Sequence, residues 1–310
     1  MSHFITLKDY SKAQIKAFLE LAVEIKKDPK KFKDMMHRKM LVMIFEKPSL
    51  RTRVSFETGM CQMGGDAIFY DMSTSPLGAG KETIEDTAKV LSRYADLIMA
   101  RLFEHDKMVQ LARNADIPVI NGLTDFNHPC QILSDLLTIQ EHKGTIAGLT
   151  LAYLGDARNN VTHSLLYGCS QMGMNIRVGC PQNEEFCPFS DVVRDVVETA
   201  RQGGTLVNVT HDPIEAATGA DIIYTDSWMS YHVPPEERDG RLNVLMPYQV
   251  NANLMQHAAP DAIFMNCLPA MRGFEQTADV VDGPQSIVFD QAENRLHAQK
   301  AIMVHLTEQS

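Results

Sequence analysis

The stretch L-V-M-I-F-E-K-P-S-L-R-T-R-V-S-F-E, from Leu41 to Glu57, passes from an apolar run through a turn into a segment with helical spacing. The run Leu41–Glu46 predicts a parallel strand covered on both faces, because such strands lack the polar and apolar alternation of half-exposed strands. Lys47-Pro48-Ser49 form the turn, and Arg51–Met63 is predicted to be a helix. A strand, a turn and a helix in this order indicate an α/β fold.

The same alternation continues along the chain. Further strands are predicted at Ala67–Tyr70, Leu97–Arg101, Pro118–Asn121, Thr150–Gly155, Asn175–Gly179, Thr205–Val209, Asp221–Tyr224 and Ala262–Asn266. Further helices are predicted at Lys12–Lys27, Glu82–Tyr94, Gln131–His142 and Asn160–Met172. Repeated strand-helix alternation predicts doubly wound α/β architecture with parallel sheets. A chain of 310 residues exceeds one typical domain, and we place the boundary near Glu141–Gly148, which predicts two α/β domains.

Composition narrows the class of protein. Apolar residues make up 45% of the chain and charged residues 22%, as in an ordinary packed globular protein. The formal net charge of -10 argues against a nucleic-acid binder but leaves room for a small anionic substrate held by local arginines. Six cysteines without a CxxC pair fit reduced thiols better than a disulfide framework. With no secretion signal and no apolar run long enough to span a membrane, we expect a cytoplasmic protein.

The turn before the second predicted helix has the features of an anion site. Ser49 is suited to cap the helix, and the N–H groups of Leu50, Arg51 and Thr52 then lie at its positive end. Hydroxyls from Ser49 and Thr52 and the guanidinium of Arg51 add donors, which predicts a phosphate site without a glycine-rich loop. The alternative interpretation is an ordinary capped helix with solvated arginines.

Two other segments support the anion site. Arg101 ends a predicted strand, and open parallel sheets bind ligands at the carboxyl ends of their strands. His128 and Gln131, in N-H-P-C-Q after another strand, could face a carbonyl or phosphate oxygen. Taken singly, Arg101 could instead form a surface ion pair and His128 could cap a helix.

These segments together resemble the aspartate/ornithine carbamoyltransferase family. Phe45–Glu57 is similar to its S-T-R-T-R motif, Asn127–Gln131 to its H-P-x-Q motif, Phe264–Pro269 to the H-C-L-P motif of the ornithine branch, and Asp290–Arg295 to D-x-A-E-N-R. Four motifs in the same order are specific where one would be weak.

The resemblance implies an organisation and a set of site residues. It implies a carbamoyl phosphate-binding domain at 1–143, an amine-binding domain at 144–290 and a last helix at 291–310 that returns to the first domain. It also implies a homotrimer with sites near subunit interfaces. The implied carbamoyl phosphate ligands are Ser49, Leu50, Arg51, Thr52, Arg101, His128, Gln131, Cys267, Leu268 and Arg295, the last assigned to the second domain. Among these, catalytic roles fall to Arg101, His128, Cys267 and Arg295, and the ornithine contacts are Asn160, Asp226, Ser230 and Tyr231.

The activity implied by the resemblance is transfer of the carbamoyl group of carbamoyl phosphate to the side-chain amine of L-ornithine. The products are citrulline and phosphate, as in arginine biosynthesis. No metal or organic cofactor is expected, and neither nucleic acid nor a membrane is expected as a partner. Direct attack by the amine explains the arrangement better than Cys267 acting as a covalent nucleophile.

The sequence departs from the family pattern at several positions, which keeps alternatives open. Leu50 replaces a threonine, the loop at 75–81 lacks the usual glutamine, Ser230-Tyr231-His232 replaces S-M-G, and Asn266 replaces a histidine. Tyr231 and His232 favour another amine, such as putrescine or a different diamino acid. The lost glutamine and Asn266 suggest a non-catalytic regulatory homologue, and the Gly155-Asp156 turn alone hints at a nicotinamide dehydrogenase. The loop at 230–241 is interpreted as a binding loop or a surface excursion.

Overall fold

The computed structural model describes residues 2–229 and 233–308 and contains two compact units. One unit combines residues up to 138 with those from 293 onward, and the other holds Ile139–Ala292. The two divisions therefore fall inside helices, whereas the sequence placed them after 143 and 290. Arg295, which the resemblance assigned to the second domain, lies in the first unit.

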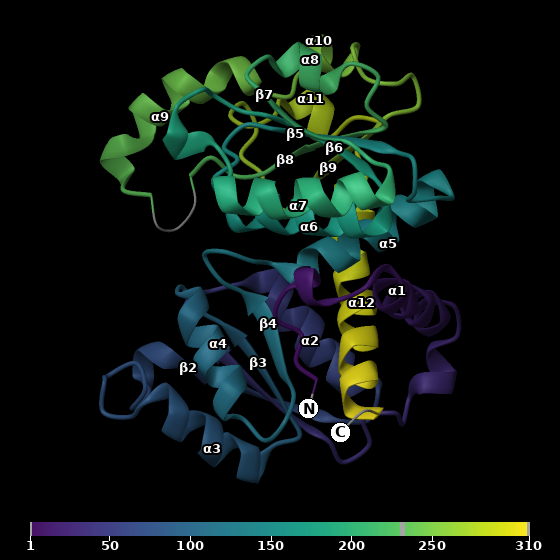
Figure 1. Ribbon diagram of the computed structural model, residues 1–310. Coiled ribbons are helices and arrows are strands. Elements are labelled where there is room, and N and C mark those ends of the chain that lie inside the picture. The colour runs from purple at the N-terminus through teal and green to yellow at the C-terminus, as the bar shows by residue number, and fades with distance from the viewer. Residues whose placement is uncertain (1, 230–232, 309–310) are drawn as a thin grey trace. The chain divides into compact units, whose positions relative to one another are not determined.

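The first unit is a four-stranded parallel sheet with helices around it (Figure 1). Its strands run in the order β2-β1-β3-β4 and are β1 (Met40–Phe45), β2 (Asp66–Asp71), β3 (Leu97–Arg101) and β4 (Val119–Leu123). Its helices are α1 (Lys12–Lys27), α2 (Leu50–Gln62), α3 (Ile84–Tyr94), α4 (His105–Asn114), the start of α5 (Pro129–Lys143) and most of α12 (Val288–Glu308). Short 3-10 turns at Leu7–Asp9, Pro29–Phe32 and Met72–Thr74 complete the unit.

Close packing of α12 on α2 holds the end of the chain in the first unit. A Cβ added at Gly59 would meet Met303 Cε at 3.0 Å and Lys300 Cγ at 3.3 Å. Gly59 therefore leaves room for the side chains of Met303 and Lys300 where α12 contacts α2, and a larger residue would require these side chains to shift slightly.

The second unit is a five-stranded parallel sheet in the order β7-β6-β5-β8-β9. Its strands are β5 (Thr150–Leu154), β6 (Asn175–Gly179), β7 (Val207–Thr210), β8 (Ile222–Thr225) and β9 (Ile263–Asn266). Its helices are the end of α5, α6 (Asn160–Met172), α7 (Ser190–Gly203), α8 (Pro213–Ala217), α9 (Arg238–Leu245), α10 (Ala252–Met255), α11 (Ala278–Val281) and the start of α12. 3-10 turns lie at Glu184–Phe186 (η4), Pro235–Glu237 (η5) and Met246–Tyr248 (η6).

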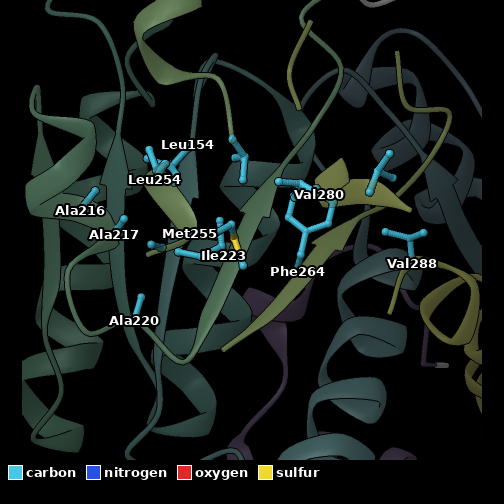
Figure 2. Packing of buried hydrophobic residues seen from close by; sticks show 13 residues of the cluster. Leu154, Ala216, Ala217, Ala220, Ile223, Leu254, Met255, Phe264, Val280 and Val288 are labelled. Carbon is cyan, nitrogen blue, oxygen red and sulfur yellow. The ribbon is translucent and has the colours of Figure 1, made fainter. Parts of the chain in front are cut away.

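One face of this sheet carries a core of small and large apolar side chains that fit together (Figure 2). Leu154 and Ile223 come from the central strands, and Phe264 comes from β9. Ala216 and Ala217 bring α8 close to the strands because their side chains are short. Truncating a buried phenylalanine such as Phe264 to alanine would cost about 3–5 kcal/mol of stability.

The doubly wound α/β class is confirmed, and all nine predicted strands are present with ends shifted by at most two residues. The five helices predicted from residue spacing are also present, and α12 is longer than the expected helix. The loop prediction for 230–241 was partly wrong, because α9 begins at Arg238. In the described residues, no helix is long and apolar enough to cross a membrane.

Strand order decides where each unit can bind a ligand. In the first sheet the winding direction reverses between β1 and β3, and in the second it reverses between β5 and β8. Ligands of open α/β sheets bind at the carboxyl ends of the strands that flank such a reversal. The segments that follow these four strands are therefore the first places to look for function.

Candidate functional site

The turn after β1 ends in a capped helix. Ser49 has extended backbone angles, and its Oγ accepts a hydrogen bond from Thr52 N at 3.2 Å, which confirms the predicted N-cap. This cap uses the Thr52 N–H that the sequence analysis had counted as a ligand donor. The N–H groups of Leu50 and Arg51 remain as donors at the helix start, where the dipole favours anions.

Positive charge surrounds His128, just after β4 and before α5. Burial holds the pKa of His128 well below its ordinary value, and Arg295, Arg101, Lys47 and Arg51 lower it further. The imidazole is therefore neutral at pH 7 and can donate a hydrogen bond without carrying charge. The four cationic side chains concentrate positive charge around one buried ring, which favours binding of an anion.

A buried hydrogen-bond network orients Arg295. Its Nη1 donates to Gln131 Oε1 at 2.6 Å, and its Nη2 donates to Thr52 Oγ1 at 3.1 Å. Gln131 Nε2 in turn donates to the buried Asp135 Oδ1 at 2.8 Å. The network joins α2, α5 and α12, so three of the predicted site residues are brought together: Thr52, Gln131 and Arg295.

Lys47 is a member of the cationic group that the sequence analysis treated only as part of a turn. Its side chain is buried, and its Nζ lies 4.6 Å from the centre of the Phe103 ring. Burial, with a smaller contribution from the charge of Arg101, lowers the pKa of Lys47 to about 8. Its position between the end of a predicted strand and the start of a predicted helix could have identified Lys47 as a site residue from the sequence.

In the second unit, the end of β8 and the end of β9 bring a carboxylate and a thiol together. Cys267 Sγ donates to Asp226 Oδ1 at 3.1 Å. Both side chains are partly exposed, as a substrate contact requires. The structure therefore pairs two predicted site residues that lie 41 positions apart in the sequence.

The turn after β5 presents the start of α6. Asn159 is the helix cap, because its Oδ1 accepts from Thr162 N at 2.8 Å, and Asn160 is the first helical residue. Asn160 is therefore not the cap of this helix. Burial raises the pKa of Asp156 to about 6 although Arg241, which forms an ion pair with it, opposes the shift.

The segment after β9 is held by Asn266, the residue that departs from the family histidine. Asn266 is fully buried, its Nδ2 donates to Gln276 Oε1 at 2.9 Å, and its Oδ1 accepts from Leu268 N at 2.8 Å. Leu268 has a φ of 57°, a region that few non-glycine residues adopt. Asn266 thus positions the turn that carries Cys267 and Leu268. Ser230 and Tyr231, predicted amine contacts, lie outside the described residues.

The fold and these groups define a class of protein: a two-unit α/β enzyme with cationic side chains around a buried histidine in one unit and a carboxylate beside a thiol in the other. A family model described as the carbamoyl-P binding domain of aspartate/ornithine carbamoyltransferase matches residues 2–141. A second, described as the Asp/Orn binding domain of the same family, matches residues 147–306. The chain belongs to the aspartate/ornithine carbamoyltransferase family.

Individual relatives agree with this assignment. The chain is 53% identical to an ornithine carbamoyltransferase of Bacillus subtilis over 96% of this chain and 92% of that protein. It is 49% identical to a catabolic ornithine carbamoyltransferase of Halobacterium salinarum over the full length of both. The solved structure of the Pyrococcus furiosus ornithine carbamoyltransferase matches with a TM-score of 0.94 and 45% identity, covering 99% of this chain and 97% of that one.

Proposed function

We propose that this protein is an ornithine carbamoyltransferase, which converts carbamoyl phosphate and L-ornithine to citrulline and phosphate. The observation that carries the proposal concerns the buried, neutral His128. Its pKa is lowered by four nearby cationic side chains: Arg295, Arg101, Lys47 and Arg51. A site of this kind suits a dianionic acyl phosphate, because it offers both positive charge and neutral hydrogen-bond donors.

Carbamoyl phosphate is bound by the first unit in this proposal. The N–H groups of Leu50 and Arg51, the Ser49 and Thr52 hydroxyls, and the guanidinium groups of Arg51 and Arg101 hold the phosphate. His128 and Arg295 face the carbonyl oxygen, and Gln131 positions Arg295 through their 2.6 Å hydrogen bond. Cys267 and Leu268 remain proposed ligands of the carbamoyl group on the basis of the family resemblance.

The reaction is attack of a neutral amine on the carbamoyl carbon. A C–N bond forms, the carbonyl oxygen becomes an oxyanion, and the bond to the phosphate oxygen then breaks. Preorganised donors stabilise such an oxyanion by about 3–4 kcal/mol each. Neutral His128 and cationic Arg101 and Arg295 are the donors that we assign to it. The reaction written this way needs neither a metal nor an organic cofactor.

The amine substrate is bound by the second unit in this proposal. Asn160 contacts its α-amino and carboxylate groups, and Asp226 and Cys267 orient the side-chain amine. Ser230 and Tyr231, which lie outside the described residues, are further proposed contacts to the amine. An alkyl ammonium has a pKa of roughly 10.4, and a nearby carboxylate favours the charged form. The ammonium therefore loses one proton to solvent before it attacks. A second proton leaves the nitrogen after the C–N bond forms, and the departing phosphate is its proposed acceptor.

The setting of the activity is part of the same proposal. We assign the protein to the cytoplasm and to arginine metabolism, and we expect a homotrimer with sites near the subunit interfaces. A domain that binds carbamoyl phosphate at 1–143, an amine-binding domain at 144–290 and a returning helix at 291–310 are proposed as the functional division. Size measured in solution by light scattering tests the trimer.

A panel of amines tests the identity of the acceptor. The purified protein is incubated with carbamoyl phosphate and, in turn, L-ornithine, putrescine, L-lysine and L-aspartate, and phosphate release and carbamoylated product are both measured. We expect the highest kcat/KM with ornithine. A higher value with putrescine or another diamine, which Tyr231 and His232 would favour, would replace ornithine but keep the carbamoyltransferase. Ligand binding with no product from any amine would support a non-catalytic homologue.

A further inference from the structure

A cluster of three metal-binding side chains lies in the second unit, outside the residues assigned to substrates. The ligand atoms of Cys180, Cys187 and His211 all lie within 4.8 Å of one another, and no other such group of three occurs in the described residues. Cys180 follows β6 and His211 follows β7, two neighbouring parallel strands. Cys187 follows the 3-10 turn η4, so the loop at 180–187 folds back on its own start.

The spacing of the two sulfur atoms matches shared ligation of a metal. Cys180 Sγ and Cys187 Sγ are 3.9 Å apart. Two thiolates on a tetrahedral Zn²⁺ with bonds of roughly 2.3 Å lie about 3.8 Å apart. A disulfide would require the sulfur atoms to approach to about 2.0 Å. The side chains therefore stand at the separation that a metal needs, before any metal is bound.

Neighbouring backbone holds the cluster in place. Cys180 N donates to Thr210 O at 3.1 Å, and Cys187 N donates to Glu184 O at 3.1 Å. The His211 ring is fixed by a 2.9 Å contact between its Nδ1 and Cys180 O, and the Tyr248 hydroxyl donates to His211 O at 2.7 Å. An imidazole whose one nitrogen is held by a backbone carbonyl is the usual arrangement of a histidine that ligates through the other.

We propose that Cys180, Cys187 and His211 form a binding site for a soft divalent metal ion of the Zn²⁺ class. Two thiolates and one imidazole are the ligands that such ions prefer, and water takes the fourth position. Cys180 is buried, Cys187 is half-buried and His211 is exposed, so the ion can enter from the His211 side.

The position of the loop gives the metal a structural effect. Ala157 N donates to Phe186 O at 2.9 Å, and Arg158 Nη1 donates to Glu184 O at 3.0 Å. These bonds join the loop at 180–187 to the turn after β5. A metal bound to the loop therefore stabilises the folded form of the second unit, because the unfolded chain does not hold the three ligands together.

Metal binding to the reduced full-length protein tests the proposal. The protein is treated with a chelator and a reductant, then titrated with Cd²⁺ while the thiolate-to-metal absorption is followed, and with Zn²⁺ in competition with a chromogenic chelator. We expect one equivalent to bind and to raise the unfolding temperature. Cys187→Ser and His211→Ala should weaken binding by more than the roughly 10- to 100-fold that loss of an outer-shell partner costs. His211→Cys should restore it.

The controls separate this site from other thiols. Cys61→Ser removes an exposed lone thiol and should leave Cd²⁺ binding unchanged. Unfolding curves of each variant without metal establish that it is folded. Binding that persists in Cys187→Ser and His211→Ala, or that is lost only in Cys267→Ser, overturns the proposal. So does a reduced protein that binds no metal but forms a Cys180–Cys187 disulfide under mild oxidation, as read by mass spectrometry.

Discussion

Replacing Arg51 with alanine removes the guanidinium that we assign to the phosphate while leaving the helix that carries it. Arg51 is the second residue of α2, and its carbonyl oxygen accepts from Ser55 Oγ at 2.5 Å, a bond that alanine keeps. Among the described residues, its guanidinium takes part in no hydrogen bond or ion pair with another side chain. The loss of stability should therefore stay within about 0.5 kcal/mol, as for a substitution away from structural contacts.

The expected loss of function is much larger. A guanidinium that binds a phosphate with two charge-assisted hydrogen bonds contributes roughly 1.5–3 kcal/mol for each bond. A total of about 3–4 kcal/mol corresponds to a decrease of roughly 100- to 1,000-fold in the affinity for carbamoyl phosphate, at 1.4 kcal/mol for each factor of ten. The same factor is expected in kcat/KM for carbamoyl phosphate. As a comparison, kcat/KM for the amine is measured at saturating carbamoyl phosphate.

Arg53→Ala is the matched control on the same helix. Arg53 Nε forms an ion pair with Glu57 Oε1 at 3.0 Å, and its guanidinium lies 3.7 Å from the centre of the Phe69 ring. Arg53→Ala removes this surface ion pair, which contributes about 0.2–1 kcal/mol of stability. It removes no contact that we assign to a ligand. Calorimetric titration with carbamoyl phosphate, initial-rate kinetics and thermal unfolding are compared for both variants. Near-normal binding by Arg51→Ala, or an equal loss in Arg53→Ala, would refute the assigned role of Arg51.

Three further outcomes follow from the same geometry. Because burial lowers the pKa of Lys47 to about 8, its positive charge is present below that pH and lost above it. The KM for carbamoyl phosphate should therefore rise as the pH increases through about 8. Lys47→Met should abolish that rise. Gly155 has a φ of 118°, and an added Cβ would meet Trp228 Nε1 at 2.5 Å. Gly155→Ala should therefore cost about 1–3 kcal/mol and lower the unfolding temperature. Gly204→Ala, with a φ of 68° but no atom within 4 Å of the added Cβ, should cost less, and an equal loss would remove the steric argument. Asp226→Asn should raise the KM for the amine more than that for carbamoyl phosphate in steady-state kinetics, and the reverse order would contradict the assignment of Asp226 to the amine.

Local patterns in the sequence predicted all of the strands but only some of the helices. Continuous apolar runs identified the buried parallel strands, since a strand covered on both faces has no polar side to expose. Ser49 was recognisable as a helix cap because the cap depends on neighbours only three residues away. Six helices of the described residues, α4, α7, α8, α9, α10 and α11, were not identified, although α7 carries Val192, Val196 and Ala200 at helical spacing.

Sequence patterns predicted the candidate functional site only in part. The motifs pointed to Arg101, His128 and Arg295, but not to their mutual orientation or to Asp135, which accepts from Gln131. Lys47 also went unassigned, because its lowered pKa is a consequence of burial beside Arg101. Asn266 looked like a loss of function in the sequence, whereas in the fold its amide holds the turn at Leu268.

The sequence by itself determined the α/β class, the capped helix start at Ser49 and the family to which the motifs belong, since each depends on residues close together in the chain. Tertiary structure alone decided that Arg295 bonds to Thr52, that Cys267 bonds to Asp226, and that Cys180 and Cys187 stand 3.9 Å apart. The physical reason is that strand order and helix packing set these distances. Both arise from burial of apolar surface over the whole unit, and no local stretch of residues contains that information.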